Sequence, residues 1–565
     1  MYKRIIFLTT GIFLMAWILY GCGTQMPVSG ENANNAVEDQ KNKMDLEQLA
    51  RGEVKLEAED LADYASGKSV INEEMPEKME YSLVMPQIPE SDDAYLYLFA
   101  LECYEESDTL SGKPITAWLK KRDSKVSFSY EEGYLFRQFV PALLIDGRYV
   151  PIGKGSYLSN PETLADNQEA YPDVGSKKGI LLDPTMLGTE KLTDLEVKHS
   201  IYNIPLSIIM GETTDEEYPT IVYSYEGKDY KFNGKVVSDY DGLFSYLTSI
   251  GMCSTAVVLN DWNDDYLHMI HPKARSKQRG AYYYMFNTEE EEGVKELEAV
   301  ASFLTQRYST GEHGMVHNWV IANEINQNKV WNYMNTTDPV YYAKEYEKAF
   351  RIFYQAARSN YAHARVYFSV DHDWNSNHGS NKSYFNARDI IEAFNDAAVE
   401  HGNYDWGIAI HPYPEPLTRV NYWSAENDKS PDAEILTIMN LNVLTDFLGQ
   451  EEYLDTNGEV RSITITELGF SSKSGEKLQA AAYAYCYYIV DANPYIDSFI
   501  LNRQTDAPEE VVNGLAFGLY EYDQSDKYLK EVFRYIDTDK ASEYTDFMLN
   551  ILGAESLEEA LSWAQ

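Results

Sequence analysis

The sequence has little positive charge. Its 565 residues include 47 Lys and Arg against 90 Asp and Glu, which gives a formal net charge of −43 at pH 7. A protein that binds nucleic acid needs clustered Lys and Arg to neutralise phosphates. The composition therefore excludes nucleic acid as a partner and disfavours a strongly polyanionic substrate. We interpret the excess of acidic side chains as a surface that keeps the protein soluble in an extracytoplasmic setting.

Cysteine is also scarce. The four cysteines are Cys22, Cys103, Cys253 and Cys486, and no two of them have the CxxC spacing. The sequence therefore indicates neither a zinc ribbon nor a disulfide framework. It contains no His-Glu-x-x-His sequence either, which argues against a zinc protease. We expect no metal site.

A long apolar stretch lies at residues 5–19, directly after Lys3 and Arg4. A charged segment followed by such a short apolar run is typical of a secretory signal rather than of a membrane-spanning helix. The next residues, Leu19-Tyr20-Gly21-Cys22, resemble a bacterial lipobox, with Tyr20 in place of the usual small or β-branched residue. The resemblance implies a signal peptide over residues 1–22 and a lipid on Cys22 that anchors the protein at the cell surface or in the periplasm. An ordinary signal peptide cut nearby and an uncleaved anchor are the alternatives.

Two segments precede the main body of the chain. Residues 23–78 are polar and acidic, and we predict a flexible tether there. Residues 79–165 contain short alternating runs at 95–99, 125–130 and 136–144, separated by turn signals such as Glu132-Gly133. This pattern predicts a β-rich, sandwich-like accessory domain.

Between residues 166 and 540, apolar strand segments alternate with helical segments. The predicted strands are at 195–203, 255–259, 281–286, 319–322, 365–370, 406–410, 463–470 and 498–501. Eight apolar strands separated by helices predict an α/β fold, a (β/α)8 TIM barrel. The alternative is a doubly wound open sheet, but no glycine-rich phosphate loop follows the first predicted strand. Ser176-Lys177-Lys178-Gly179 is interpreted as linker, and residues 541–565 as a helical tail.

Capping signals predict where two of the helices begin. Thr288 and Glu291 have the spacing of a capping box. Asp338-Pro339 places a capping carboxylate before a proline at the first helical position. We therefore expect helices that begin near residues 288 and 338.

Polar and aromatic side chains gather at the carboxyl ends of the predicted strands, where barrel active sites lie. They are Asn260, Trp262, Asn287, Asn323, Glu324, Asp371, His372, Trp374, His411, Tyr413, Glu467, Asn502 and Arg503. Two strands that each deliver a glutamate to one rim supply the two carboxylates that a glycosidase needs. Taken alone, Asn323-Glu324 is more often a helix cap or a solvated loop.

Two other groups at the strand ends have both a functional and a purely structural interpretation. Asp371-His372-Asp373 could bind a divalent metal, but such a cluster is more often a hydrogen-bonding rim, which we favour. Trp262 and Trp374 could be sugar platforms, and packing under a loop would explain them equally well.

This set of strand ends resembles that of the clan A retaining glycoside hydrolases. Asn323-Glu324 ends the predicted fourth strand, Glu467 ends the seventh, and His411-Pro412-Tyr413 is similar to a His-x-Tyr element of that clan. The resemblance implies that Glu324 is the general acid/base and Glu467 the nucleophile. It also implies that Asn323 binds the sugar's 2-hydroxyl, that Tyr413 steadies Glu467, and that no cofactor is needed.

The resemblance has one departure and a defined extent. In clan members strand eight commonly ends on a Trp that forms the floor of the subsite for the cleaved sugar. This chain has Asn502-Arg503 at that position. The clan resemblance covers roughly residues 195–536. More of the chain, including Asn160-Pro161-Glu162 and Ser176-Lys177-Lys178-Gly179, resembles an uncharacterised bacterial family of such barrels.

We therefore expect a monomeric, retaining glycoside hydrolase that acts on an extracytoplasmic poly- or oligosaccharide. The alternatives are a non-catalytic carbohydrate-binding lipoprotein with a glycosidase-like barrel and a structural surface protein. Convergence of Glu324 and Glu467 in one open cleft would favour the enzyme, and a structural protein would have no cleft.

The lipobox can be tested directly. Replacing Cys22 with Ser should release the protein from membranes, because a lipid chain and not a spanning helix would hold it there. The measurement is the distribution of the protein between membrane and soluble fractions, with uptake of labelled fatty acid. Wild-type protein that never takes up the label would show that Cys22 is not lipidated.

Overall fold

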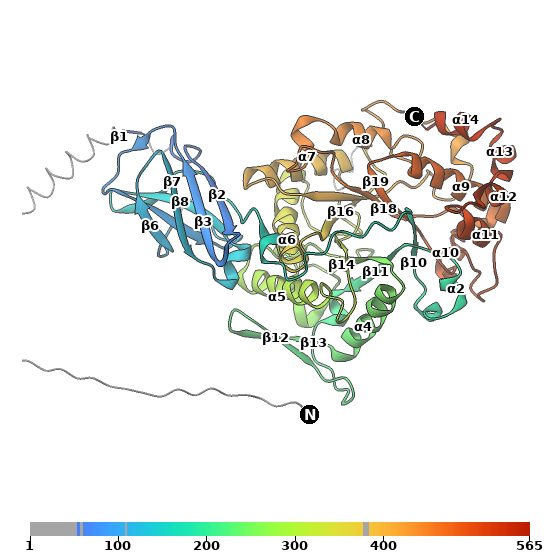
Figure 1. Ribbon diagram of the computed structural model, residues 1–565, viewed down its shortest axis with the longest axis horizontal. Helices are drawn as coiled ribbons and strands as arrows, with labels where there is room; N and C mark the ends of the chain where they lie inside the picture. Colours follow the sequence, from blue (N-terminus) through green and yellow to red (C-terminus); the bar gives the residue numbers. More distant parts are fainter. Residues whose placement is uncertain (1–52, 57–59, 108–109, 377–383, 565) are drawn as a thin grey trace, which may run out of the picture. The chain divides into compact units, whose positions relative to one another are not determined.

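Eight parallel strands close into a barrel in the computed structural model (Figure 1). In order around the barrel they are β10 (Lys178–Leu181), β11 (His199–Pro205), β14 (Cys253–Leu259), β15 (Asn318–Ile321), β16 (Arg365–Asp371), β17 (Trp406–His411), β18 (Ile463–Leu468) and β19 (Ile496–Leu501). β10 pairs with β19 and so closes the ring. The predicted TIM barrel is confirmed.

The structure describes residues 53–56, 60–107, 110–376 and 384–564. The predicted signal peptide, Cys22 and the first part of the predicted tether lie outside these residues. No helix in the described part of the chain combines the length and the apolar character needed to cross a membrane.

One predicted barrel strand is wrong and one was missed. Residues 281–286 form only isolated bridges, such as that between Tyr284 and Tyr333, and they lie in the connection that follows β14. The first barrel strand is instead β10, within the segment interpreted as a linker. β10 begins with Lys178-Gly179, so no apolar run marks it, and the buried Lys178 ammonium is satisfied by Asp537 at 2.6 Å. The two errors cancel, so Glu324 does follow the fourth strand and Glu467 does lie at the end of the seventh.

The barrel strands are buried on both faces, as a sheet covered by helices requires. All seven residues of β14 are buried. Inside the barrel, inward side chains from several strands form one apolar cluster: Ile201, Val257, Leu259, Val320, Tyr367, Ala409 and Ile500. This plug lies below the mouth of the barrel, so the polar strand ends sit on a rigid floor.

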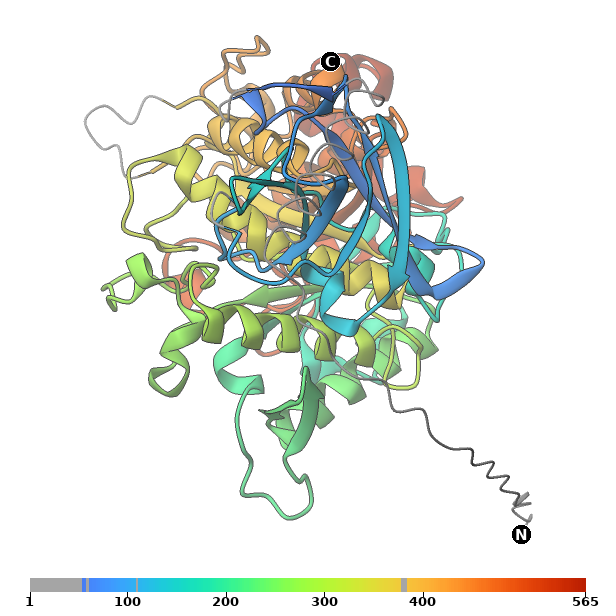
Figure 2. The same cartoon turned by 90° about the vertical axis from the view of Figure 1, so that its left-hand side faces the viewer.

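Helices surround the barrel. They are α4 (Gly234–Ser249), α5 (Glu291–Arg307), α6 (Pro339–Asn360), α7 (Ala387–Glu400), α8 (Asn442–Leu448), α9 (Glu476–Ala492) and α11 (Leu529–Tyr535), with the short α2 (Glu190–Thr193), α3 (Leu206–Ile209) and α10 (Pro508–Val512) in connections. α5 and α6 lie side by side in both views (Figures 1 and 2). The predicted tail consists of α12 (Ala541–Thr545), α13 (Phe547–Leu552) and α14 (Leu557–Ser562), and it is tied to α9 by the hydrogen bond from the Tyr485 hydroxyl to the Ala560 carbonyl.

The two predicted helix starts have different outcomes. Asp338 caps α6, because its carboxylate accepts from the amides of Val340 and Tyr341. The predicted capping box at Thr288 is wrong, because α5 begins at Glu291 after Glu290. The Thr288 hydroxyl instead donates to the Glu345 carboxylate on α6, at 2.6 Å.

Two antiparallel sheets precede the barrel in the chain. One contains β2 (Ser66–Asn72), β3 (Met75–Val84) and β7 (Asp123–Ser129), and the other β6 (Thr116–Leu119), β5 (Tyr95–Leu101), β8 (Gln138–Ile145) and β9 (Arg148–Pro151). Aromatic rings pack between the two sheets. The ring centroids of Phe128 in β7 and Phe139 in β8 are 6.1 Å apart. This agrees with the predicted sandwich. The predicted tether is wrong from Ser66 onward, since those residues form β2 and the start of β3.

Four further short strands lie outside the barrel and these two sheets. β1 (Glu53–Val54) and β4 (Ile88–Pro89) have two residues each. The hairpin of β12 (Ile221–Tyr225) and β13 (Lys228–Phe232) turns at Glu226-Gly227, before α4.

A buried ion cluster joins the sandwich to the barrel. The Arg137 guanidinium of the sandwich contacts Glu102 at 2.6 Å, Glu226 at 3.0 Å and Glu298 of α5 at 3.0 Å. Lys295 pairs with the same three carboxylates. Three carboxylates thus share two cations. Burial and the neighbouring Glu298 charge raise the pKa of Glu102 to about 7.

This cluster predicts a pH-dependent stability. The pKa of Glu102 rises from 4.5 to about 7 on folding, so the folded state holds this proton more tightly than the unfolded state. The free energy of unfolding should therefore fall by about 1–3 kcal/mol as the pH rises through that interval. Urea unfolding across the interval measures it. Glu102→Gln should flatten the wild-type slope, the exposed Glu106→Gln should leave it unchanged, and equal slopes for all three proteins would contradict the prediction.

Candidate active site

Glu324 and Glu467 line the same cavity, of about 250 Å³, at the mouth of the barrel. Glu324 follows β15 after a short turn, whereas Glu467 is the next-to-last residue of β18. One His411 nitrogen, Nδ1, lies 2.7 Å from an oxygen of Glu324 and 4.0 Å from an oxygen of Glu467. Those two oxygens are therefore no more than about 7 Å apart. At this separation both carboxyls can contact the same glycosidic bond.

The backbone turns sharply where β15 delivers its glutamate. Ala322 and Glu324 have φ of 61° and 36°, in the left-handed region that residues with a Cβ seldom adopt. Neighbouring strands hold this turn in place: the Ala322 amide donates to Val258 at 2.9 Å, and the Glu324 amide donates to the Ser369 hydroxyl at 3.1 Å. Such strained turns persist where the surrounding structure enforces them, and they concentrate at functional sites.

Glu324 is largely enclosed. Its side chain is 14% exposed, against 38% for that of Glu467. Burial raises the pKa of the Glu324 carboxyl above its usual value, with smaller contributions from the charges of Asp371 and Glu467 and an opposing one from His411. The acid form is thereby favoured. Loss of hydration, more than the second glutamate, is responsible.

His411 is a buried hydrogen-bond bridge. Nδ1 contacts Glu324, and Nε2 lies 3.0 Å from the Thr466 hydroxyl. Burial alone would lower the pKa of His411, but the hydrogen bond to Glu324 and the charges of Glu467 and Asp371 raise it above its usual value. A protonated imidazole can donate from both nitrogens, so His411 fixes the orientation of Glu324.

Two donors converge on one oxygen of Glu467. The Tyr413 hydroxyl donates to Oε1 at 3.0 Å and the Asn502 amide at 3.1 Å, while Asn502 also donates to the Tyr413 oxygen at 3.0 Å. Burial and the charge of Glu467 raise the pKa of Tyr413 well above its usual value, so the phenol keeps its proton. Both contacts hold the Glu467 carboxyl in one orientation. Tyr413 thus lies where the family resemblance implied.

Four of the predicted substrate-binding residues line the cavity: Asn323, His411, Asn502 and Arg503. Asn323 is half-buried and turned to the cavity. Arg503 pairs with Glu510 at 3.1 Å, and Glu510 is a further wall of the cavity that the sequence did not single out. The Asn502–Arg503 peptide bond is cis.

Other predicted sugar contacts serve the scaffold instead. The buried Asn260 amide donates to the carbonyls of Met269 and Met285, and Asn287 donates to His268. Trp374 is 1% exposed and packs on Phe447, with ring centroids 5.1 Å apart. Trp262 packs on Tyr284 and donates to Asp264, outside the cavity lining. Polar groups at a strand end are needed equally to satisfy the backbone of the loops that cover it.

Asp371, His372 and Asp373 form a hydrogen-bonding rim. The Asp371 carboxylate accepts from Asn326 at 2.5 Å and from Gln327 at 2.7 Å, and Gln327 also donates to Asp373 at 2.8 Å. His372 Nε2 lies 3.9 Å from Asp373. The hydrogen bonds of Asp371 and Asp373 agree with the favoured interpretation as a rim, and they hold the loop that follows Glu324.

The cavity has an aromatic wall that was not predicted from the sequence. Tyr283 and Trp331 line it, with ring centroids 6.0 Å apart, and Trp331 stacks on Tyr282 at 4.8 Å. Tyr283 lies in the segment mistaken for a strand, and Trp331 lies five residues beyond Asn326 in the loop after β15. The cluster Tyr282-Tyr283-Tyr284 was the available signal, but nothing local pairs it with Trp331.

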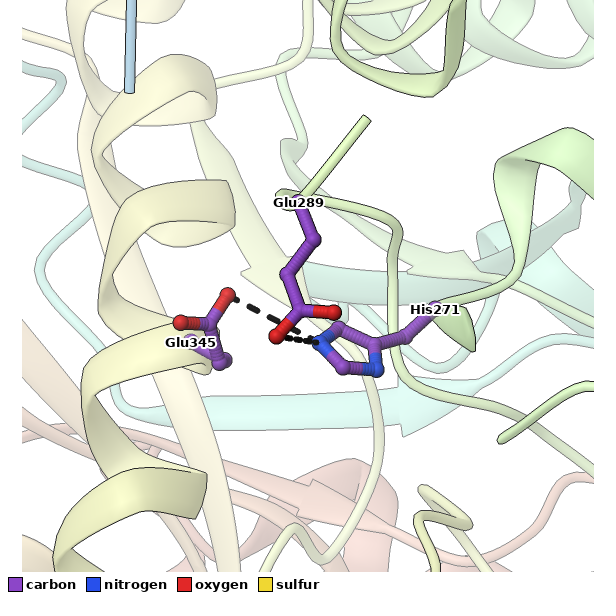
Figure 3. Close-up of side chains that lie close together, drawn as sticks. All are labelled: His271, Glu289 and Glu345. Carbon is purple, nitrogen blue, oxygen red and sulfur yellow. Dashed lines mark ion pairs between the residues drawn. The ribbon is translucent and has the colours of Figure 1, made fainter. Parts of the chain in front are cut away.

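One group of metal-ligating side chains occurs in the described part of the chain: His271, Glu289 and Glu345 (Figure 3). His271 is fully buried, and its Nε2 lies 3.6 Å from Glu289 and 3.7 Å from Glu345. However, Nδ1 accepts the Lys273 amide at 3.1 Å. A neutral imidazole that accepts at Nδ1 carries its proton on Nε2, and a protonated nitrogen cannot ligate a metal. We therefore interpret the group as structural.

Comparison with known proteins gives one family and distant structural similarities. The family described as "Family of unknown function (DUF5722)" matches residues 170–560. No curated protein matches the sequence. Among solved structures, the chain is similar to a family 39 glycoside hydrolase from Bacteroides cellulosilyticus WH2, at 14% identity and a TM-score of 0.43 over 79% of this chain and 77% of that one.

Two further solved structures are similar. One is the GH53 catalytic domain from Ignisphaera aggregans, at 11% identity and a TM-score of 0.39 over 66% of this chain and 98% of that one. The other is an exo-β-1,4-mannosidase from Opitutaceae bacterium strain TAV5, at 12% identity and a TM-score of 0.38 over 67% and 63%. Similarities this distant assign no activity, and the barrel is established by its own strand order and register.

The contrast between Trp374, which is buried in the core, and Trp331, which lines the cavity, can be tested by mutation. Trp374→Ala should lower the free energy of unfolding by about 3–5 kcal/mol, because it leaves a cavity among packed side chains. Trp331→Ala should change it by less than about 1.5 kcal/mol, because this half-buried ring lines an open cavity. Denaturant unfolding measures both, and equal losses would show that Trp331 is also core.

Proposed function

This chain belongs to the family of unknown function DUF5722, and we propose that it is a glycoside hydrolase that cleaves with retention of anomeric configuration. The observation that carries the proposal is the convergence of Glu324 and Glu467 in one cavity, where Glu324 is largely enclosed and Glu467 is more exposed. Burial favours the acid form of Glu324, while the more exposed Glu467 accepts hydrogen bonds from Tyr413 and Asn502. A glycosidase needs one carboxyl of each kind.

The reaction proceeds in two displacements. In the first, Glu324 gives its proton to the glycosidic oxygen as the bond to the anomeric carbon breaks, and Glu467 bonds to that carbon. In the second, water gives a proton to the Glu324 carboxylate, and its oxygen replaces Glu467 on the anomeric carbon. Protons and bonds balance without a cofactor, so none is proposed.

The spacing of the two carboxyls supports retention over inversion. A retaining pair is about 5–5.5 Å apart, whereas an inverting pair needs about 6.5–9.5 Å to admit a water. The upper bound of about 7 Å set by His411 allows the first range in full and only the edge of the second.

The surrounding side chains have roles that follow from their contacts. His411 stabilises the Glu324 anion once its proton has left, because its pKa is raised and its Nδ1 faces that carboxyl. Tyr413 holds Glu467 in line for attack. Asn323 and Tyr283 both line the cavity, which supports a role for Asn323 in binding the 2-hydroxyl and for the Tyr283 ring as an apolar surface under the sugar.

A carbohydrate-binding protein without turnover is less well supported. Binding sugar hydroxyls requires hydrogen-bond donors and acceptors but not an enclosed acid beside a carboxylate, since burying a carboxyl costs stability. The enclosed, strained position of Glu324 is therefore better explained by catalysis.

The proposal also includes the oligomeric state, the type of substrate and the location of the enzyme. We propose that the enzyme acts as a monomer on an extracytoplasmic poly- or oligosaccharide, held at the cell surface or in the periplasm by a lipid on Cys22. The lipobox-like sequence and the net charge of −43 support an exported protein.

The nucleophile provides the decisive test. Against a panel of aryl glycosides of neutral sugars, Glu467→Gly should reduce turnover of any substrate of the wild type by at least about 10⁴-fold, because the covalent step is lost. Azide should then restore turnover by occupying the vacated space, and NMR should identify a glycosyl azide of the anomeric configuration opposite to the substrate. The exposed Glu459→Gly is the matched control. Inverted products from the wild type would contradict retention, and undiminished turnover by Glu467→Gly would contradict the whole assignment.

A further inference from the structure

A second pocket, of about 600 Å³, adjoins the catalytic cavity. Leu181 and Arg503 line both, so the two hollows meet at these side chains. The walls of the second pocket come from the segments that follow β10 and β19 and from the connection around Tyr522. It therefore opens on the same carboxyl-end face of the barrel as the two glutamates.

The position of this pocket around the barrel is informative. In the closed strand order, β19 and β10 are neighbours and lie across the barrel from β15 and β16. Glu324 follows β15 and protonates the leaving group, so the leaving group departs on that side. The second pocket lies on the opposite side, where the part of the substrate that stays bonded to Glu467 must extend.

Buried hydrogen bonds hold the floor of the second pocket. The side chain of the fully buried Gln504 accepts a hydrogen bond from the Asp183 amide at 2.9 Å. The backbone amide of Gln504 donates to the Leu181 carbonyl at 3.0 Å. Asp506, 3% exposed, pairs with the buried Lys527 at 2.5 Å. The segments after β10 and β19 are thus fixed to each other, and a pocket fixed in advance loses little entropy when it binds.

The lining has the chemistry of a neutral sugar site. Tyr522 is 70% exposed at the rim and presents a flat face with a hydroxyl. Asp183, Thr505 and Gln524 offer acceptors and donors for sugar hydroxyls. Acidic side chains outnumber the one cation, Arg503, which is already paired with Glu510, so an anionic sugar would be repelled.

We propose that the second pocket binds the neutral sugar unit next to the one that is attacked, on the side retained by the enzyme. This inference rests on the proposed hydrolase function for its direction but not for the binding itself. With a sugar held there, the enzyme cleaves within a chain or releases pieces of two or more sugars, and does not remove single terminal sugars.

Binding can be measured without turnover. Full-length Glu467→Gln should bind a printed array of neutral oligosaccharides of one to six sugars, with affinity for its preferred glycan rising at least tenfold from one sugar to three. Adding Tyr522→Ala should remove that rise, because the platform is lost. Tyr495→Ala, an equally simple loss of an exposed ring that precedes β19 at the opposite end of the barrel, should preserve it. Absence of any glycan binding, or a length dependence that survives Tyr522→Ala, would overturn the pocket.

The cleavage pattern tests the direction. Wild-type protein is given the preferred glycan with a label at its reducing end, and mass spectrometry identifies the unlabelled products. Unlabelled products of two or more sugars are expected, and stepwise release of single unlabelled sugars would overturn the proposal. Length-dependent binding removed by Tyr522→Ala, together with no turnover of the bound glycan by the wild type, would support the pocket and reject the hydrolase.

Discussion

The hydrogen bond between His411 Nδ1 and Glu324, at 2.7 Å, is the contact on which the proposed chemistry of this barrel depends. It lies in a largely enclosed position where a carboxylate alone would be poorly solvated. In the proposed reaction, burial keeps the proton on Glu324 before the glycosidic bond breaks, and the imidazole stabilises the Glu324 anion afterwards. Because Nε2 of the same ring contacts Thr466 of β18, the strand that carries Glu467, one side chain relates the positions of both glutamates.

The rest of the site is arranged around that contact as two environments. Glu467, more exposed, receives hydrogen bonds from Tyr413 and Asn502. Glu324, more enclosed, sits on a backbone turn that neighbouring strands hold in the left-handed region. The apolar plug of the barrel supports both positions from below, so the geometry is set by the scaffold and not by the substrate. This division of roles between two carboxyls is the physical basis of the proposed double displacement.

Much of the site could be predicted because strand ends are local features of the sequence. The apolar segments at 319–322 and 463–466 mark buried strands, and the glutamates that follow them must reach the barrel mouth. The His411-Pro412-Tyr413 segment was placed near the nucleophile by resemblance, and its tyrosine contacts Glu467. Prediction failed where packing decides the role of a residue. Trp374 comes shortly after β16 as Asn323 does after β15, and Asn287 follows a segment that was predicted to be a strand, but both Trp374 and Asn287 are buried in the core.

By itself the sequence determined the fold class, the two glutamates and the β-rich nature of the segment before the barrel, because apolar periodicity and strand-end chemistry are written in short stretches. Only the tertiary structure decided that β10 is the first barrel strand, since its buried Lys178 is neutralised by Asp537, more than 350 residues away. Only the tertiary structure brought Trp331 beside Tyr283 and opened a second pocket beyond Arg503. These features depend on contacts between loops that are distant in sequence, and no local pattern encodes which loops meet.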